Sequence, residues 1–572
     1  MKKLITAVLA VTMIFLISCG TAGTKEKSLK ESALAKNYAP ESSMILMSFS
    51  SLELLFSAFD VQPNSVMGEP VPENVKAEMT EALGFNPADP LEYDKIGLDI
   101  KREFGLILSD LKVNGSDPEM TSADIGFLFP VKKGADSFGY IKNRMNSLQK
   151  EGVTVTENDG LLRITVEGQE NISVSVKSDG DYLAFNLSIN SASTADMYFV
   201  SPKHLSDSPN YKEVAKEISM GSDFSFYLDA QKLMAGNAEA LNSLAKQHPS
   251  LGTGQMGSFD MLKHNRGSGI VCDLSSSDLV IRSVGFADPE HIMYKLSKAE
   301  NNKSVITGIE KKPALLLAFV INAKEYLDYI LKTLPEESVV AFENEIQSYK
   351  DMTGVDIRTD FINELAGSIN LGIFDGATVN LMQYNSVLNF NMKDRNKFIA
   401  IIDKVAPMAN IQKMSPEAVA EMIQGKTVPE NTDLYSINLG MTFMYIVVEG
   451  NNVSICTSKE LSADAVDKNN AGFISKLDKK LSEGLKNDIN YFYIDFNESY
   501  LATKNIYQFF AGMSGGENVL NEKVDGFVNK FDYLYAYGNI DGQKVNSELI
   551  VKTKFSKPFF QALKEEITKL QQ

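Results

Sequence analysis

The 572-residue chain contains no tryptophan, although it has 21 tyrosines and 32 phenylalanines. Carbohydrate platforms and the energetic centres of protein interfaces favour Trp and Tyr for their large rigid contact area. The absence of tryptophan therefore argues against a dedicated sugar-binding platform. Hydrophobic residues make up 44% and charged residues 23% of the chain, which is typical of a folded protein rather than a disordered one.

Positive charge is also scarce. The chain has 56 Lys and Arg against 74 Asp and Glu, a formal net charge of −18. Such a surface repels phosphate backbones, and the sequence has no dense basic stripe to overcome that repulsion. Nucleic acid is therefore not expected as a partner, and anionic lipid headgroups are not expected to hold the chain by charge alone.

Histidine is rare, and none of the four is spaced as metal ligands usually are. They are His204, His248, His264 and His291. No cysteine pair accompanies them, so neither a zinc site nor a histidine-based active site is predicted. Gly252–Gly257 matches GxGxxG but follows a helix end and a loop instead of a buried strand, which favours a plain loop. We expect no cofactor, no metal and no catalytic residue.

If the protein were an enzyme, a pair of carboxylates would be the most natural catalytic groups. Asp229 and Asp495 end equivalent strand patterns, and Asp99 and Asp356 follow Gly-hydrophobic pairs. An Asp at the point where a strand gives way to a helix normally caps that helix, by accepting backbone N–H bonds. We therefore expect these four residues to be caps or turn residues, with a carboxylate-based hydrolase as the weaker alternative.

The N-terminus has the three parts of a secretory signal. Lys2 and Lys3 precede an almost wholly apolar segment, which closes on Leu16-Ile17-Ser18-Cys19. This closing segment resembles the lipobox of bacterial lipoproteins. The resemblance implies that residues 1–18 are removed and that the Cys19 thiol carries a diacylglyceryl group, so that the mature chain is anchored outside the cytoplasm. Because Gly20 rather than Asp follows Cys19, the resemblance also implies the outer membrane in a bacterium with two membranes, and otherwise the outer face of the plasma membrane.

Residues 19–36 begin with a polar, aperiodic stretch that we interpret as a flexible tether. No later run approaches eighteen consecutive apolar residues, so the lipid alone is expected to hold the chain at the membrane. The other cysteines, Cys272 and Cys456, sit in strand-like runs. We interpret them as two buried thiols, and a disulfide between them stays open as the less favoured alternative.

The rest of the chain has the pattern of a divergent tandem duplication. Met44–Phe49 resembles Ala314–Phe319, and Ile172–Ser188 aligns without gaps on Thr442–Ser458. Further matches keep the same order: Gly97–Ile100 with Gly354–Ile357, and Phe226–Asp229 with Phe492–Asp495. We place the first unit at residues 37–300 and the second at residues 301–572.

Within each unit the apolar period alternates between 2 and 3.6. Tight-turn signals predict four hairpins: residues 153–166, 172–187, 443–456 and 533–553. Helices are predicted around Tyr211–Ile218, Ile474–Leu481 and Phe559–Leu570. The sequence therefore predicts an α+β fold of two tandem similar domains. Each domain is expected to be a sheet of antiparallel strands, curved or flat, with helices packed on one face.

This layout resembles the large uncharacterised families of duplicated secreted or lipid-anchored bacterial proteins, and the resemblance implies no active site. We expect a non-enzymatic, lipid-anchored envelope protein that acts as a scaffold or interaction module with another envelope protein. The alternative is a carrier for a lipid or other apolar ligand. A carrier would show apolar residues on both faces of some strands; Thr442–Val448 has that pattern, which helices on the second face would explain equally well.

Overall fold

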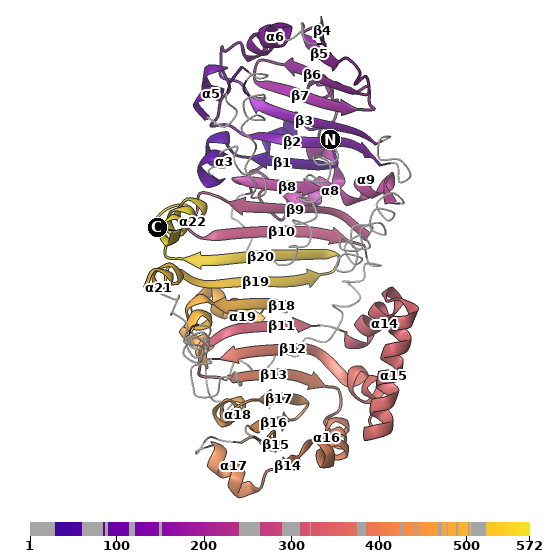
Figure 1. Cartoon of the computed structure of the whole chain (residues 1–572), viewed down its shortest axis with the longest axis vertical. Coiled ribbons are helices and arrows are strands. Elements are labelled where there is room, and N and C mark those ends of the chain that lie inside the picture. The colour runs from indigo at the N-terminus through magenta and orange to yellow at the C-terminus, as the bar shows by residue number, and fades with distance from the viewer. Residues whose placement is uncertain are drawn as a thin grey trace. The chain divides into compact units, whose positions relative to one another are not determined.

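The computed structural model describes residues 29–59, 80, 84–85, 90–113, 121–147, 152–238, 264–288, 309–320, 322–374, 385–423, 426, 428–440, 443–466, 472–477, 479–487, 490–501, 504 and 522–571. The strands of these described residues belong to one twenty-stranded sheet. The chain divides into two compact units: unit 1 comprises Met1–His291, Gln543–Glu548 and Phe555–Thr568, and unit 2 comprises the remainder. Figure 1 shows the helices and strands of both units.

Unit 1 contributes ten strands in which every neighbouring pair is antiparallel. The strands are β1 (Ile45–Phe49), β2 (Phe104–Lys112), β3 (Ser122–Pro130), β4 (Val153–Asn158), β5 (Leu161–Val166), β6 (Ile172–Ser178), β7 (Tyr182–Ile189), β8 (Phe224–Leu228), β9 (Asn265–Asp273) and β10 (Leu279–Ala287). Their order across the sheet is β4-β5-β6-β7-β3-β2-β1-β8-β9-β10.

Short helices connect these strands. They are α2 (Ala33–Asn37), α3 (Leu52–Phe59), α5 (Pro90–Lys95), α6 (Ser137–Ser147), α7 (Met197–Val200), α8 (Pro209–Ala215) and α9 (Ala230–Ala235), with α22 (Phe559–Gln571) at the end of the chain. Helix α8 begins with Pro209 at its first turn, where the missing N–H costs no hydrogen bond. The predicted helices at 211–218 and 559–570 correspond to α8 and α22 and are confirmed.

The strands of unit 2 pair in the corresponding order, β14-β15-β16-β17-β13-β12-β11-β18-β19-β20, although residues 544–548 of β20 belong to unit 1. The strands are β11 (Pro313–Val320), β12 (Leu365–Phe374), β13 (Asn385–Met392), β14 (Ile411–Lys413), β15 (Thr432–Asn438), β16 (Phe443–Glu449), β17 (Asn452–Cys456), β18 (Asn490–Asp495), β19 (Phe531–Asp541) and β20 (Lys544–Thr553). The helices are α14 (Ala323–Thr333), α15 (Glu336–Thr353), α16 (Arg395–Ala409), α17 (Pro416–Ile423), α18 (Lys459–Val466), α19 (Lys479–Asn487) and α21 (Glu522–Val528).

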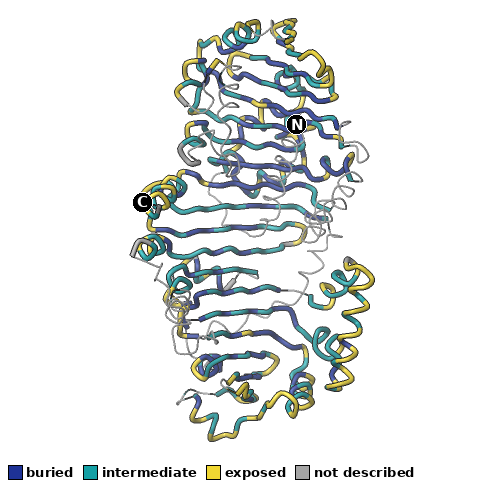
Figure 2. The backbone as a smooth tube through the Cα atoms, viewed as in Figure 1, coloured by how far each residue is buried: buried dark blue, intermediate teal, exposed yellow. Residues whose placement is uncertain are grey.

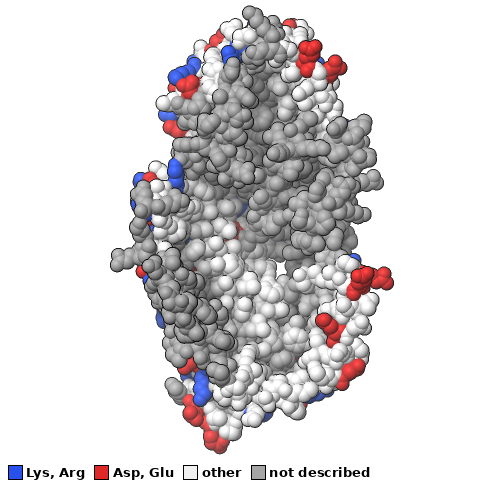
Figure 3. Space-filling view, in the orientation of Figure 1, with Lys and Arg blue, Asp and Glu red and all other residues white. Residues whose placement is uncertain are grey.

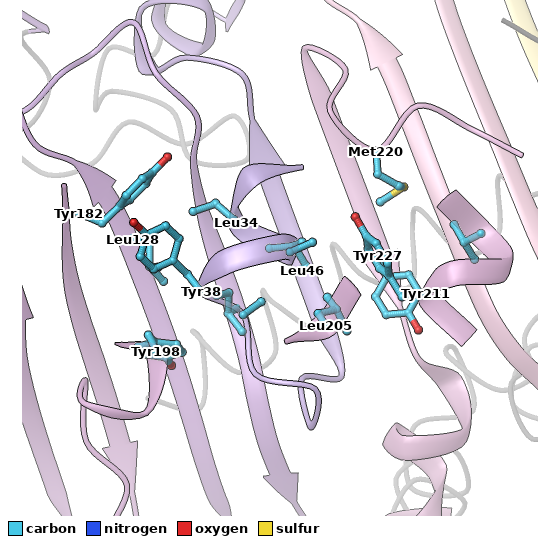
Figure 4. Packing of buried hydrophobic residues seen from close by; sticks show 14 of the residues in the cluster. Leu34, Tyr38, Leu46, Leu128, Tyr182, Tyr198, Leu205, Tyr211, Met220 and Tyr227 are labelled. Carbon is cyan, nitrogen blue, oxygen red and sulfur yellow. The ribbon is translucent and has the colours of Figure 1, made fainter. Parts of the chain in front are cut away.

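Hydrophobic cores lie on both faces of the sheet in unit 1. Tyr182 and Ala184 of β7 belong to a core that also holds Leu34 of α2 and Val214 of α8. Leu183, between them on the strand, points to the opposite face, because successive side chains alternate. It belongs to a second core. Figure 4 shows α2 lying over the strands, with Tyr38 beside Tyr182, and their ring centroids are 4.5 Å apart.

The second core of unit 1 is covered by a helix of its own. Ile141 of α6 is 3% exposed and lies in the same cluster as Leu162 and Val176, which are also buried. In unit 2, Phe398 and Ile402 of α16 pack in the same way in a core on β13, β15, β16 and β17. Burial in both units is deepest along the central strands (Figure 2). Helices therefore cover parts of both faces.

The α+β class and the antiparallel pairing are confirmed. A separate sheet in each domain was expected, whereas the structure has one sheet of twenty strands. The expectation that helices occupy only one face is wrong, because α2 and α6 pack on opposite faces of β7. The boundary predicted at residues 300/301 lies outside the described residues.

All four predicted hairpins form. The turn between β4 and β5 uses Asp159 and Gly160, both with positive φ (50° and 72°), as a two-residue hairpin turn requires. The continuous helix predicted over Ile474–Leu481 is wrong. A 3₁₀ turn at Phe473–Lys476 ends at Leu477, whose backbone is extended (φ −84°, ψ 161°), and α19 begins only at Lys479.

Candidate apolar binding face

Several of the sequence features considered as sites fall in parts of the chain that the structure does not describe. Cys19 and the Gly252–Gly257 loop lie outside the described residues, as do His248 and His291. His204 precedes a short 3₁₀ turn, and its backbone N–H donates to Asp207 Oδ2 at 3.1 Å. Within the described ranges, no three His, Cys, Asp or Glu side chains come together as metal ligands would.

Asp229 is a helix cap, as predicted. Its side chain accepts a hydrogen bond from the Lys232 N–H at the start of α9 (3.0 Å), and Lys232 Nζ lies 3.4 Å from its second oxygen. The Tyr227 hydroxyl donates to the same second oxygen at 3.3 Å. Burial and the negative charge of Asp229 raise the pKa of Tyr227, so the phenol stays a donor. Each carboxylate oxygen of Asp229 is occupied by structural bonds.

Asp495 repeats this arrangement in unit 2. It accepts from the Glu498 N–H at 2.9 Å and from the Tyr493 hydroxyl at 3.3 Å, and Lys312 forms an ion pair with it. Burial raises the pKa of Tyr493, as does the charge of Asp495. Both aspartates are almost fully buried, and each is held by groups of its own unit. The arrangement is that of a cap rather than of an acid or base facing a cleft.

Asp99 and Asp356 recur because a turn recurs. Gly97 and Gly354 both have positive φ (83° and 68°), a conformation that glycine adopts without strain. Asp99 then accepts from the N–H two residues later at 3.1 Å, and Asp356 does so at 3.0 Å. The hydrogen bond from Lys350 lowers the pKa of Asp356. The turn interpretation is confirmed for both residues.

The two cysteines are free and buried, which confirms their interpretation as thiols packed in a core. Cys272 lies on β9 and Cys456 on β17, which are not corresponding strands of the two units. Burial raises the pKa of each thiol to about 12. Neither is a reactive nucleophile in the folded protein.

A row of apolar side chains crosses the sheet of unit 1 on the face opposite α2. The strand registers place Phe226, Met47, Leu106, Phe127 and Phe185 side by side on β8, β1, β2, β3 and β7. Phe226 is 1% exposed, whereas Phe127 is 37% exposed and Met47, Leu106 and Phe185 are half-buried. The row is therefore covered at one end and accessible toward its middle.

Beside this row runs a ladder of phenylalanines on the same face, the Phe ladder of Phe49, Phe104 and Phe129. The Phe49 and Phe104 rings stack with centroids 5.3 Å apart and planes 11° apart. Phe104 and Phe129 follow at 6.2 Å and 8°. Phe129 then meets Phe185 edge-on at 6.0 Å. These rings on neighbouring strands form a continuous half-buried aromatic surface.

Unit 2 has a row at the corresponding strand positions. The registers place Phe492, Leu317, Leu371, Leu388 and Ile455 side by side on β18, β11, β12, β13 and β17. Leu388 is 36% exposed, and the other four side chains are half-buried. The next residue along, Ile446 on β16, is only 5% exposed and belongs to the core beneath α16. All five members of this row are therefore at least partly accessible, and the row becomes covered beyond Ile455.

Neither row contains a charged or hydrogen-bonding side chain. In the view of Figure 3, the described Lys, Arg, Asp and Glu side chains gather mostly along the outline, at strand ends and on helices. Sequence reasoning did not identify Phe127 or Leu388. The available signal was apolar residues on both faces of a strand, and Tyr445 and Ile446 in the flagged segment do point to opposite faces. Both of these side chains are buried, whereas Phe443 of the same segment is 47% exposed, so the pattern alone does not separate core from open surface.

No family model matches the chain, and no curated protein matches it. It is similar to solved structures titled crystal forms I, III and IV of TP0453, at 8% identity and TM-scores of 0.22–0.23. These alignments cover 44–46% of this chain and 80–83% of the other. At such scores the likeness supports no statement about fold or function.

Proposed function

We propose that this chain is a non-enzymatic, lipid-anchored envelope protein that binds an apolar ligand on the accessible rows of its sheet. The observation that carries the proposal is the pair of rows centred on Phe127 and Leu388, which present apolar side chains at corresponding places in both units. Large apolar side chains that remain accessible in a row mark a binding surface more than isolated ones do.

The chemistry of the rows favours a hydrocarbon occupant over a protein. Protein interfaces carry roughly one hydrogen bond per 100–200 Å². The ten side chains of the two rows offer no donor or acceptor, so their complement is a ligand without polar groups in that region. At the usual strand spacing the accessible part of the row is about 14 Å long in unit 1, from Met47 to Phe185, and about 19 Å long in unit 2. These lengths suit part of a long acyl or isoprenoid chain.

The anchor is a separate part of the proposal. It rests on the likeness of Leu16-Ile17-Ser18-Cys19 to a lipobox, with the acylated Cys19 placing the protein on the outer side of a membrane. In the described part of the chain, no helix is long and apolar enough to cross a membrane. Several acyl chains on one residue would hold the protein firmly at the envelope.

We also propose that the chain arose by tandem duplication. The corresponding order of strand pairings in the two units supports this origin. So does the repeated cap, in which Tyr227 with Asp229 and Tyr493 with Asp495 make the same 3.3 Å contact at corresponding strand ends. Two ligand-binding rows would then descend from one ancestral row.

The experiment is to purify residues 19–572 with Cys19→Ser, extract bound material and titrate a fluorescent long-chain fatty acid. We expect apolar material to co-purify. We also expect Phe127→Asp and Leu388→Asp each to weaken binding at least tenfold, because a charge in the row must be desolvated when the ligand binds. Val200→Asp and Leu439→Asp are matched controls, since these side chains are 63% and 56% exposed and lie outside the rows.

A protein that carries no apolar material and binds no fatty acid would contradict this function. If Phe127→Asp and Leu388→Asp instead abolished capture of an envelope protein, the rows would be the contact surface of an interaction module. Membrane fractionation of the acylated chain against Cys19→Ser tests the anchor independently.

A further inference from the structure

The β15–β16 hairpin of unit 2 ends in a tip that carries well-exposed apolar side chains. Leu439 in the turn is 56% exposed, Phe443 at the start of β16 is 47% exposed, and Met408 in the last turn of α16 is 49% exposed. Asn438 pairs with Phe443, and its N–H donates to the Asn410 carbonyl oxygen at 3.3 Å, which joins the hairpin to the end of α16. We call residues 408–411, 437–440 and 443–444 the neutral tip.

The neutral tip lies within two stretches of the sequence that have no charged residue. One runs from Val405 to Gln412 and the other from Leu434 to Val448. The chain as a whole is strongly acidic, with a formal net charge of −18. A charged side chain is costly to move from water into hydrocarbon, so this part of the surface can enter hydrocarbon without that cost.

The corresponding hairpin of unit 1 has the opposite chemistry. Its strands β5 and β6 take the places of β15 and β16 in the order of pairing, and Ser173 is the paired residue nearest the turn on β6, as Phe443 is on β16. The turn of unit 1 contains Glu167 and Glu170, which are both exposed. This hairpin therefore forms without apolar side chains at its turn, so those of unit 2 are not a requirement of the fold.

The backbone of the neutral tip is hydrogen-bonded within the tip and to α16. The Asn410 N–H donates to the Ala406 carbonyl oxygen, and the Gly440 N–H donates to Asn438 Oδ1 at 2.8 Å. Backbone groups without a partner are costly in hydrocarbon, because no water is present there to bond them. These bonds therefore suit the tip to the boundary of a bilayer.

Apolar side chains point to both faces of the hairpin at the neutral tip. Successive residues of a strand alternate, so Phe443 and the half-buried Met444 point to opposite faces. Met444 pairs with Ile437, which packs against the core beneath α16. A protein partner docks on one face, whereas a bilayer surrounds whatever enters it. This distribution favours lipid over a protein or a second copy of the chain.

We propose that the neutral tip is a membrane contact, which inserts Leu439, Phe443 and Met408 into the boundary between the headgroups and acyl chains of a bilayer. Leu and Phe are typical of surfaces that enter this boundary, and the strength of such binding scales with the apolar area buried. Three partly exposed side chains hold weakly by themselves. The inference rests on the lipid anchor of the proposed function, which would keep a bilayer within reach of the tip at high effective concentration. It does not rest on ligand binding by the rows.

The test uses the absence of tryptophan from the chain, since Phe443→Trp introduces a single indole at the neutral tip. Residues 19–572 are coupled through the Cys19 thiol to a maleimide-bearing lipid in phosphatidylcholine vesicles, which supplies the tether whatever the cell attaches to Cys19. Cys272 and Cys456 are buried and do not compete for the coupling.

We expect the indole emission of Phe443→Trp to shift to shorter wavelength on the vesicles and to be quenched by phosphatidylcholine brominated on its acyl chains. The physical reason is that an apolar face at this boundary lies about 5–10 Å into it. Leu439→Trp should report the same event from the turn, which keeps the test decisive if Phe443→Trp fails to fold.

Val166→Trp is the matched control. Val166 is 43% exposed at the end of β5, next to Glu167 in the corresponding hairpin of unit 1, and we expect no quenching of its indole. Adding Leu439→Glu to Phe443→Trp should abolish the quenching, because a carboxylate in the turn must then be desolvated on insertion.

Absence of quenching in both Phe443→Trp and Leu439→Trp would overturn the inference, as would equal quenching in Val166→Trp. An emission shift that grows with protein density and is insensitive to brominated lipid would show that a second copy covers the tip, and would overturn it too. Fatty-acid binding by the same protein separates this result from the proposed function. A tethered protein that binds fatty acid without quenching refutes the membrane contact and leaves the rows as a binding surface.

Discussion

Phe127 on β3 and Leu388 on β13 occupy corresponding positions in the two units and are exposed to the same extent, 37% and 36%. In its row, Phe127 lies between Leu106 and Phe185. Leu388 lies in the same way between Leu371 and Ile455. A large apolar side chain at both places gives the units a common accessible centre.

These two side chains contribute little to stability, because much of their surface stays in water. We expect Phe127→Ser and Leu388→Ser each to lower the free energy of unfolding by about 1 kcal/mol, since partial burial gives only part of the usual transfer energy. Phe226→Ala, in the same row but 1% exposed, is expected to cost about 3–5 kcal/mol.

Urea unfolding followed by circular dichroism measures these differences. A cost of 3 kcal/mol or more for Phe127→Ser would show that its ring is a core residue. The binding interpretation of the row would then lose its basis.

The caps at Asp229 and Asp495 give a second prediction. Replacing either by Ala removes the acceptor for the first helical N–H groups and leaves a buried tyrosine hydroxyl without its partner. We expect a loss of about 1–2 kcal/mol in each case. Asp→Asn keeps a side-chain oxygen and should cost less, and neither change should alter ligand binding.

Comparing the Ala and Asn variants by urea unfolding tests whether the role is capping. If Asp229→Asn lost as much stability as Asp229→Ala, the charge and its Lys232 partner would be the important feature. A selective loss of ligand binding would instead move these residues into a functional site.

The sequence predicts hairpins and caps well because their signals are local. Asp159-Gly160 determines a turn, and an Asp after a strand determines a cap, whatever lies far away in the chain. The sequence does not predict the break in the helix at Leu477, because the spacing of Ile474, Leu477 and Leu481 suits a continuous helix. The extended backbone at Leu477 has no signal in that spacing.

The accessible rows could not be predicted for a different reason. Alternating apolar residues on both faces of a strand are equally compatible with two covered faces and with one open face. Ile141 of α6 packs in one core with Leu162 and Val176, whereas Phe127 on the same face lies outside that core and is 37% exposed. Likewise, helices on both faces follow from packing between segments distant in sequence.

The ion pair between Arg102 and Asp181 predicts a pH dependence. Two nearly parallel bonds of 2.8 and 3.0 Å join the guanidinium to the carboxylate, and the bond from Arg102 lowers the pKa of Asp181 below its usual 3.8. A lowered folded-state pKa stabilises the fold above the unfolded value, and this contribution disappears as the pH falls through the folded-state pKa.

Arg102→Met should therefore destabilise the protein at pH 7 by at most about 1 kcal/mol, because both side chains are partly exposed. The difference from the unchanged protein should begin to shrink near pH 3.8 and disappear once the pH is below the folded-state pKa of Asp181, as unfolding curves between pH 7 and pH 2 would measure. A difference that stays constant from pH 7 to pH 2 would come from the guanidinium lying 5.1 Å above the Tyr182 ring.

The buried thiols give the last prediction. Cys272 and Cys456 are free, and burial raises the pKa of each to about 12. At pH 8 a thiol with that pKa is almost wholly protonated, whereas an exposed cysteine near 8.5 is partly thiolate and reacts. We expect residues 19–572 with Cys19→Ser to show almost no reaction with a thiol-specific chromogenic disulfide at pH 8, and two reactive thiols per chain in denaturant.

Rapid reaction of one thiol in the folded state would show local opening around β9 or β17, and the single Cys→Ala variants would identify which. Fewer than two thiols in denaturant, restored by reduction, would instead show that the two cysteines form a disulfide.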